Sequence, residues 1–202
     1  MYSVELMVAE HDRILRMIEV VRRMCVGVLE GGEVPEDDFR QAIDFIRHFA
    51  DGHHHGKEED FLFPEMVSHL GPAAQNLVTH GMLVEHDLGR NHVREWEMAL
   101  DRYRETHAPE DKLDILAEAM GYGRLLRRHI EKENNVVYTF AERALPPEVR
   151  QQIDEKSRAY EERTSSKETR ARYDALLGAL EKKYVGNCAV SAADDTSGRL
   201  ER

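Results

Sequence analysis

The sequence predicts an all-α protein: an up-down-up-down four-helix bundle with one or two additional C-terminal helices. Apolar residues recur at steps of three and four along four long segments, which is the period of one buried helix face. Most of the six prolines fall at the ends of these segments, where a helix tolerates them. The composition, with 41% hydrophobic and 33% charged residues, is typical of a helix-rich globular protein.

Composition and charge also narrow the classes of partner. The net charge of −11 argues against a nucleic-acid or anionic-membrane surface, because phosphate groups bind to basic patches. The chain has no apolar run long enough to span a membrane, and its acidic first residues do not resemble a signal peptide. Two cysteines are too few for a disulfide framework or a cysteine zinc site, so we expect a reducing, cytoplasmic location. The oligomeric state is left open.

The first helix is expected over residues 3–29, with Ser3 as its cap and the Gly31-Gly32 pair as its end. Its apolar stripe has a gap at position 11, which His11 fills. A buried imidazole needs either a hydrogen-bond partner or a metal ion. Taken alone, His11 is explained by a hydrogen bond in the core.

The second helix is expected to begin at Pro35, and its inner face passes through Ile46 and Ala50 to His54 and Glu58. Residues four apart leave the same face of a helix, so the imidazole of His54 and the carboxylate of Glu58 can act together. An isolated histidine and glutamate at this spacing usually form a hydrogen-bonded pair on the protein surface. Here, however, the pair continues a buried stripe.

A second register of the same helix remains open. His55 and Glu59 have the same spacing but lie about 100° further round the helix. His53 is paired by its spacing with Lys57, which cannot bind a metal while it is protonated. The apolar stripe favours His54 with Glu58 over this second register.

A third helix is expected over residues 72–103, after a Gly-Pro break. His86 lies on its buried face, in register with apolar residues on either side. His80 and His92 are each six positions from His86 and therefore face elsewhere. We expect both of them to be exposed to solvent.

The fourth helix follows Pro109 and is expected to reach about residue 143. One buried seam, at steps of four and three, contains Tyr122, Leu126, His129, Glu133, Val136 and Phe140. A lone carboxylate on such a seam would be unfavourable, so Glu133 is expected to be protonated, paired or bound to a metal. Tyr122 is either a core aromatic residue or a hydroxyl close to the site.

Two shorter amphipathic helices, near residues 148–162 and 168–184, are expected to pack against the bundle. The end of the chain is rich in Ser, Ala, Asp and Gly and has no periodicity, which is typical of disorder. We therefore divide the chain into a bundle at residues 1–145, a helical appendage at 146–185 and a disordered tail at 186–202.

Each of the four main helices thus carries one histidine on its buried face, and two of them add a glutamate four residues later. This pattern indicates a pseudo-symmetric pair of hairpins whose polar residues converge in one bundle interior. The candidate metal ligands are His11, His54, Glu58, His86, His129 and Glu133. Six nitrogen and oxygen donors exceed a tetrahedral zinc site but suit two octahedral ions bridged by the carboxylates. They favour iron, with manganese or zinc as alternatives.

The order of these motifs resembles a known family. The motifs are Glu-His-Asp at residues 10–12, His-x-x-x-Glu-Glu-x-x-Leu-Phe-Pro at 54–64, Glu-His-Asp at 85–87 and His-x-x-x-Glu-Asn at 129–134. Together they are similar to the hemerythrin-like, or HHE cation-binding, domain over about residues 4–143. The resemblance implies that the same six residues bind two iron ions, with Glu58 and Glu133 bridging them and an oxide or hydroxide between the ions.

Two departures separate the chain from the oxygen-carrying hemerythrins of invertebrates. Those proteins have a fifth histidine four residues from the third-helix ligand, where this chain has Met82 and Arg90, and their last carboxylate is an aspartate. The set here is more similar to the di-iron proteins of iron–sulfur cluster repair and to iron-sensing hemerythrin domains. The resemblance therefore implies a cytoplasmic protein that binds or senses O2, NO or iron. The alternatives are a di-iron oxidoreductase that removes NO or peroxide, and a structural bundle with a vestigial site.

Overall fold

The computed structural model describes residues 1–186, which fold entirely into helices and the turns that connect them. The α-helices are α1 (Tyr2–Leu29), α2 (Glu36–Phe45), α3 (Phe63–Leu77), α4 (Leu83–Thr106), α5 (Pro109–Lys132), α6 (Tyr138–Ala144), α7 (Pro147–Glu162) and α8 (Thr164–Tyr184). Wider π-helical segments lie between some of them: η1 (Ile46–His55), η2 (Glu58–Leu62), η3 (Val78–Met82) and η4 (Glu133–Val137). The predicted all-α class is confirmed.

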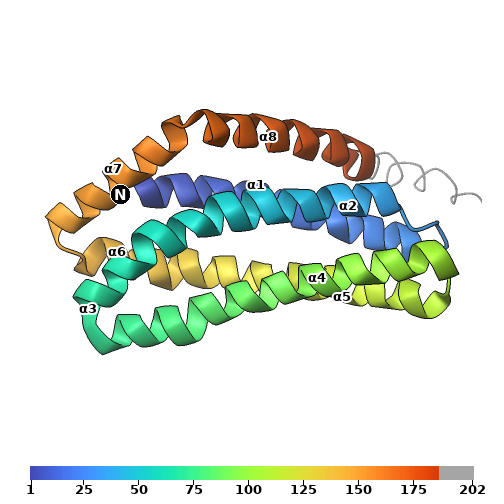
Figure 1. The fold of residues 1–202 in the computed structure, drawn as a ribbon, viewed down its shortest axis with the longest axis horizontal. Helices are drawn as coiled ribbons and strands as arrows, with labels where there is room; N and C mark the ends of the chain where they lie inside the picture. Colours follow the sequence, from blue (N-terminus) through green and yellow to red (C-terminus); the bar gives the residue numbers. More distant parts are fainter. Residues whose placement is uncertain (187–202) are drawn as a thin grey trace, which may run out of the picture.

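The long helices α1, α2, α4 and α5 lie along the longest axis of the molecule (Figure 1). The helix that begins as α2 continues through η1 and η2 into α3, and α5 continues through η4 into α6. After α6 the chain turns back through α7, and α8 then runs along the outside of α1 (Figure 1). None of the described helices combines the length and apolarity needed to cross a membrane.

A strict count of four core helices is not what the described residues give, because α8 also belongs to the core. Tyr173, Leu177 and Leu180 of α8 are buried in the same hydrophobic cluster as residues of α1 and α2. The hydroxyl of Tyr173 donates to Oδ2 of Asp44 at 2.9 Å, which fixes α8 on α2. Apart from Gly186, the predicted disordered tail at 186–202 lies outside the described residues.

The core consists of two apolar clusters with a polar layer between them. On α1 one cluster begins at Ile14 and the other includes Val4 and Met7, which leaves His11 in the middle. The other three long helical stretches repeat this order: apolar, then polar, then apolar. The polar residues of four different segments therefore meet at one level of the bundle, closed off by apolar side chains at both ends.

The π-helical segments η1, η2 and η4 coincide with this polar layer. A π-helical turn accommodates one more residue than an α-helical turn and changes which side chains face inward. In η1 the consecutive residues His53, His54 and His55 are all buried, with exposed fractions of 2%, 0% and 5%. His54 and His55 are buried in the polar layer, whereas His53 is covered by Tyr160 and Glu161 of α7.

Gly71 separates the second long helical stretch from the third. Its φ of 71° and ψ of −161° lie in a region of backbone conformation that only glycine adopts readily. The next residue, Pro72, starts the helix that leads into α4. The predicted break at this position is confirmed.

Replacing Gly71 with alanine should lower the free energy of unfolding by about 1–3 kcal/mol, because the side chain would strain the backbone. The matched control is Gly178→Ala on α8, where a methyl group meets nothing within 4 Å. That change should be neutral or stabilising by up to about 1 kcal/mol, because alanine favours helix. Urea unfolding of both variants measures the difference; equal midpoints would contradict the strain at Gly71.

Candidate metal centre

The six residues predicted from the sequence lie together in the polar layer, and His55 joins them. They form two overlapping sets in which the donor atoms are within 4.8 Å of one another. The first set is His11, His54, Glu58 and Glu133, and the second is His55, Glu58, His86 and His129. All seven side chains are buried, and Glu58 belongs to both sets.

Each of the five imidazoles uses its Nδ1 atom for a bond to an oxygen on its outer side. The pairs are His11 with Asn134 Oδ1 (2.8 Å), His54 with Glu10 Oε2 (2.9 Å), His55 with Asp51 Oδ1 (3.2 Å), His86 with Glu59 Oε1 (2.6 Å) and His129 with Glu85 Oε2 (2.9 Å). An ionised carboxylate or an amide oxygen only accepts, so Nδ1 is the protonated nitrogen in every ring. In the neutral rings, the lone pair is therefore on Nε2. This is the arrangement in which proteins hold histidine ligands of a metal.

The Nε2 atoms point into the layer, where they meet further acceptors instead of donors. Nε2 of His86 and Nε2 of His129 are 3.1 Å apart. Nε2 of His129 is 3.0 Å from Oε1 of Glu133, and Nε2 of His11 is 3.2 Å from Oε2 of the same carboxylate. Lone pairs this close repel each other unless a proton or a cation lies between them.

While the rings are neutral and carry their proton on Nδ1, several of these inner atoms also receive no hydrogen bond from residues 1–186. They are Nε2 of His54, Oε2 of Glu58 and both carboxylate oxygens of Glu133. A buried acceptor without a donor is costly, and a metal ion satisfies several acceptors at once. The donor set, neutral imidazoles with two carboxylates, therefore fits divalent metal ions well.

Burial and charge set the protonation of the layer in the metal-free protein. Burial lowers the pKa of His54 to about 4 and that of His55 to about 3, so both rings are neutral near pH 7. Burial and the negative charge of Glu133 raise the pKa of Glu58 well above its usual range. Burial would lower the pKa of His129, but the charge of Glu133 outweighs it and raises that pKa. A metal ion entering the layer must displace such protons.

The layer has an approximate two-fold symmetry that is visible in the numbering. His86, His129 and Glu133 each follow their counterparts His11, His54 and Glu58 by 75 positions. The outer partners obey the same relation. Glu10 supports His54 as Glu85 supports His129, and Glu59 supports His86 as Asn134 supports His11. Each of these four supporting residues is thus the chain neighbour of a candidate ligand on a different helix, whereas Asp51 supports His55 from the same helix.

An aromatic residue covers each half of the layer. The ring of Tyr138 stacks on His11, with centroids 5.6 Å apart, and the ring of Phe63 stacks on His86 at 5.9 Å. Tyr138 also donates its hydroxyl hydrogen to Oε1 of Glu58 at 2.6 Å. This bond orients one carboxylate oxygen of Glu58 and leaves the other facing the layer.

Behind His54 lies a third cluster, which an ammonium group already fills. The Nζ atom of Lys57 contacts Glu10, Glu161 Oε1 (2.7 Å) and His53 Nε2 (3.3 Å), and its side chain is 1% exposed. Glu161 comes from α7, so the C-terminal helices contribute directly to the surroundings of His54. His53 and Lys57 were paired by spacing in the sequence, and they are in contact here.

The sequence placed His54 and His55 on different helix faces as alternatives, whereas the structure buries both rings in the layer. His80 is exposed as expected. The prediction that His92 is exposed is wrong: it is half-buried, and its Nδ1 bonds Glu118 Oε2 at 2.6 Å. The outer partners and Tyr138 were missed. The recurring Glu before His, at residues 10 and 85, was the available signal for two of them.

The comparison with protein families gives one match, to the hemerythrin HHE cation binding domain, over residues 2–141. This range contains all seven residues of the polar layer and most of the chain. Comparisons with curated proteins and with solved structures gave no match.

Replacing Lys57 with methionine should lower the free energy of unfolding by about 3–5 kcal/mol, because it leaves Glu10 buried without the ammonium group, while Glu161 keeps its ion pair with Arg170. The control is Lys156→Met, which removes a largely exposed lysine from its ion pair with Glu65 and should cost less than about 1 kcal/mol. Urea unfolding of the metal-free proteins measures both. A Lys57 variant as stable as the control would show that the buried cluster is not held by its ammonium.

Proposed function

Because the chain belongs to the hemerythrin HHE cation-binding family, we propose that its polar layer holds two iron ions, bridged by carboxylates, and that the protein binds or senses O2, NO or iron through them. The observation that supports this proposal most strongly is that lone pairs of imidazole nitrogens and of the Glu58 and Glu133 carboxylates point into the polar layer. Five imidazoles donate outward from Nδ1, and in four of them, all except His55, Nε2 lies within 3.8 Å of a buried carboxylate oxygen. Such a set needs cations to be stable.

The two overlapping sets support two ions rather than one. His11 and His54 would serve one ion, and His86 and His129 the other, with His55 as a further donor on the second side. Glu58 belongs to both sets, and Oε1 of Glu133, from the first set, is 3.9 Å from Nε2 of His86 in the second, so these two carboxylates would be the bridging ligands. Nitrogen and oxygen donors without thiolates favour iron, and the charge balance leaves room for a bridging oxide or hydroxide.

The chain itself would contribute positioning and exclusion of water. The outer carboxylates and Asn134 fix each ring in the tautomer that ligates, and the Tyr138 hydroxyl orients Glu58. The apolar clusters above and below keep the layer dry. A bound pair of metal ions would supply the redox chemistry and share the charge of a small ligand.

The same proposal assigns a role to each part of the chain. Residues 1–145 would form the metal-binding unit, with the four ligand-bearing helices running up, down, up and down. Residues 146–185 would be an appendage that braces it through Glu161. We also propose a cytoplasmic location, since a content of only two cysteines fits a reducing compartment.

A second candidate function is reductive removal of NO or peroxide at the same centre. A cavity of about 120 Å³ beside His55 and His86 favours it, because a turning-over centre needs a place for its substrate. Turnover with an added electron donor would favour this oxidoreductase, whereas stoichiometric binding without turnover would favour the binding or sensing protein. A vestigial structural bundle is the least favoured candidate, because all five outer partners are in place.

Protein produced with iron and purified without oxygen should contain about two irons per chain by metal analysis, since the layer offers two sets of donors. Its optical spectrum should change on exposure to oxygen or nitric oxide. Removing the metal with a chelator should lower the melting temperature, because bound metal stabilises the folded state. A metal-free protein whose melting temperature is unaffected by the chelator would point to the vestigial bundle.

His54→Ala should lose iron and stability together, because it removes a ligand and leaves Glu10 and Glu58 without their imidazole. His80→Ala is the matched control, since His80 is exposed and should affect neither. Iron content and melting temperature of both variants are compared with the unmodified protein. If His54→Ala keeps its full iron content, the ligand assignment is wrong.

A further inference from the structure

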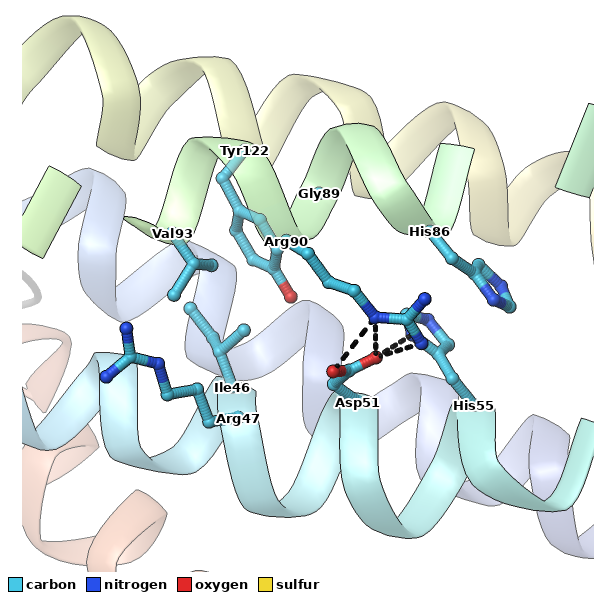
Figure 2. A pocket seen from close by; sticks show the side chains of 9 residues that line it. All are labelled: Ile46, Arg47, Asp51, His55, His86, Gly89, Arg90, Val93 and Tyr122. Carbon is cyan, nitrogen blue, oxygen red and sulfur yellow. Dashed lines mark hydrogen bonds and ion pairs between the residues drawn. The ribbon is translucent and has the colours of Figure 1, made fainter. Parts of the chain in front are cut away.

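A cavity of about 120 Å³ lies beside the polar layer, between η1, α4 and α5 (Figure 2). Its inner end is formed by His55 and His86, and its walls include Ile46, Gly89 and Val93. A water molecule in the liquid takes up about 30 Å³, so the cavity has room for a molecule of a few atoms. The cavity thus gives one side of the layer a space that is matched to small molecules.

The two-fold symmetry of the layer fails in the wall of this cavity. The residue three positions after His86 is Gly89, whereas the residue three positions after His11 is Ile14. The space that the structure has beside Ile14 and Ile18 is only about 10 Å³. Glycine therefore leaves room in the cavity wall, where the counterpart position on α1 carries an isoleucine side chain.

One polar group that lines the cavity forms no hydrogen bond within the described fold. Tyr122 is 3% exposed, and its hydroxyl has no hydrogen-bond partner in the part of the chain that the structure describes. Figure 2 shows this hydroxyl pointing into the space between Ile46 and Arg90. An unbonded buried hydroxyl is unfavourable, and a bound molecule in the cavity would satisfy it.

The rim of the cavity carries charge, but none of it is available to an anion. The two rim arginines are paired: Arg90 with Asp51 (2.8 Å), Glu59 (2.7 Å) and Asp87 (3.0 Å), and Arg47 with Glu97 (2.6 Å). Carboxylates outnumber cations in this group, and the chain as a whole carries a net charge of −11. An anion would be repelled from the rim, and the apolar walls would disfavour it further.

We propose that this cavity is the binding site for the small ligand of the centre, a neutral molecule of a few atoms that accepts a hydrogen bond from Tyr122. The inference rests on the proposed function, because His55 and His86 connect the cavity to the candidate ligand sets. The ion pair of Arg90 with Asp51 lies at the rim, where the arginine side chain is 40% exposed. Tyr122 is a binding residue in this scheme, and Gly89 provides the space.

The first test is a nitric oxide titration of the iron-loaded protein under anaerobic conditions. Tyr122→Phe keeps the ring and removes the hydroxyl, so it should bind nitric oxide about tenfold more weakly, equivalent to about 1.4 kcal/mol, with unchanged iron content. Tyr103→Phe, which alters a tyrosine of the same core away from the cavity, should bind as the unmodified protein does. Equal affinity in Tyr122→Phe with full iron content overturns the cavity proposal and leaves the metal proposal standing.

The second test works without metal. Because the hydroxyl of Tyr122 has no partner in the described fold, the metal-free Tyr122→Phe protein should melt at the same temperature or higher. A lower melting temperature would mean that the hydroxyl is bonded within the fold, and would overturn the proposal whether or not iron binds. Tyr103→Phe again serves as the control.

Gly89→Ala tests the space itself. Its methyl group would lie 3.5 Å from Leu126 and 3.7 Å from Tyr122, so it fits without strain while narrowing the cavity wall. It should weaken nitric oxide binding and leave iron content unchanged, whereas Gly27→Ala on α1, where the methyl meets nothing within 4 Å, should do neither. Unchanged nitric oxide affinity in Gly89→Ala would show that the ligand does not enter here.

Discussion

The polar layer imposes one constraint on the molecule: positive charge must enter the middle of the bundle. Five imidazoles in this layer donate hydrogen bonds outward from Nδ1, and two buried carboxylates lie on their inner side. The outer acceptors fix the tautomers, so the inner lone pairs cannot rearrange to bond one another. Protons relieve part of this repulsion in the metal-free state, as the raised pKa of Glu58 indicates. The rest of the fold places apolar clusters on both sides of the layer, which strengthens every charge interaction within it.

Much of the fold was predictable because the signals are local and periodic. The steps of three and four locate the long helices, and the Gly-Pro pair at residue 71 marks the break between two of them. The packing of α8 against α1 and α2 was less predictable. Its contacts join residues more than a hundred positions apart, such as Tyr173 with Asp44. The sequence pattern of neither segment predicts which other segment it packs against.

The candidate site was also predictable in part. Periodicity identified the residues on helical stripes, but it did not identify the contacts that depend on local helix geometry or on other helices. His11, His54, His86 and His129 fall on apolar stripes, so periodicity finds them. His55 escapes that argument because the π-helical turns change the number of residues per turn where the polar layer lies. Four of the five outer partners lie on other helices from the rings that they support, so helical spacing within one segment cannot reveal those pairs. Asp51 is the exception, because it lies four residues before His55 on the same helix.

Through the contact of Lys57 with Glu161, helix α7 influences the electrostatic field at the polar layer. Glu10 bonds both His54 and Lys57, and Lys57 in turn holds a carboxylate on α7. A shortened chain that stopped before α7 would therefore keep every residue of the polar layer and still change the field around His54. The ammonium group would lose one of its two carboxylates and rely on Glu10 alone, in competition with the imidazole. All the candidate ligands would still be present, but the basicity of His54 would differ.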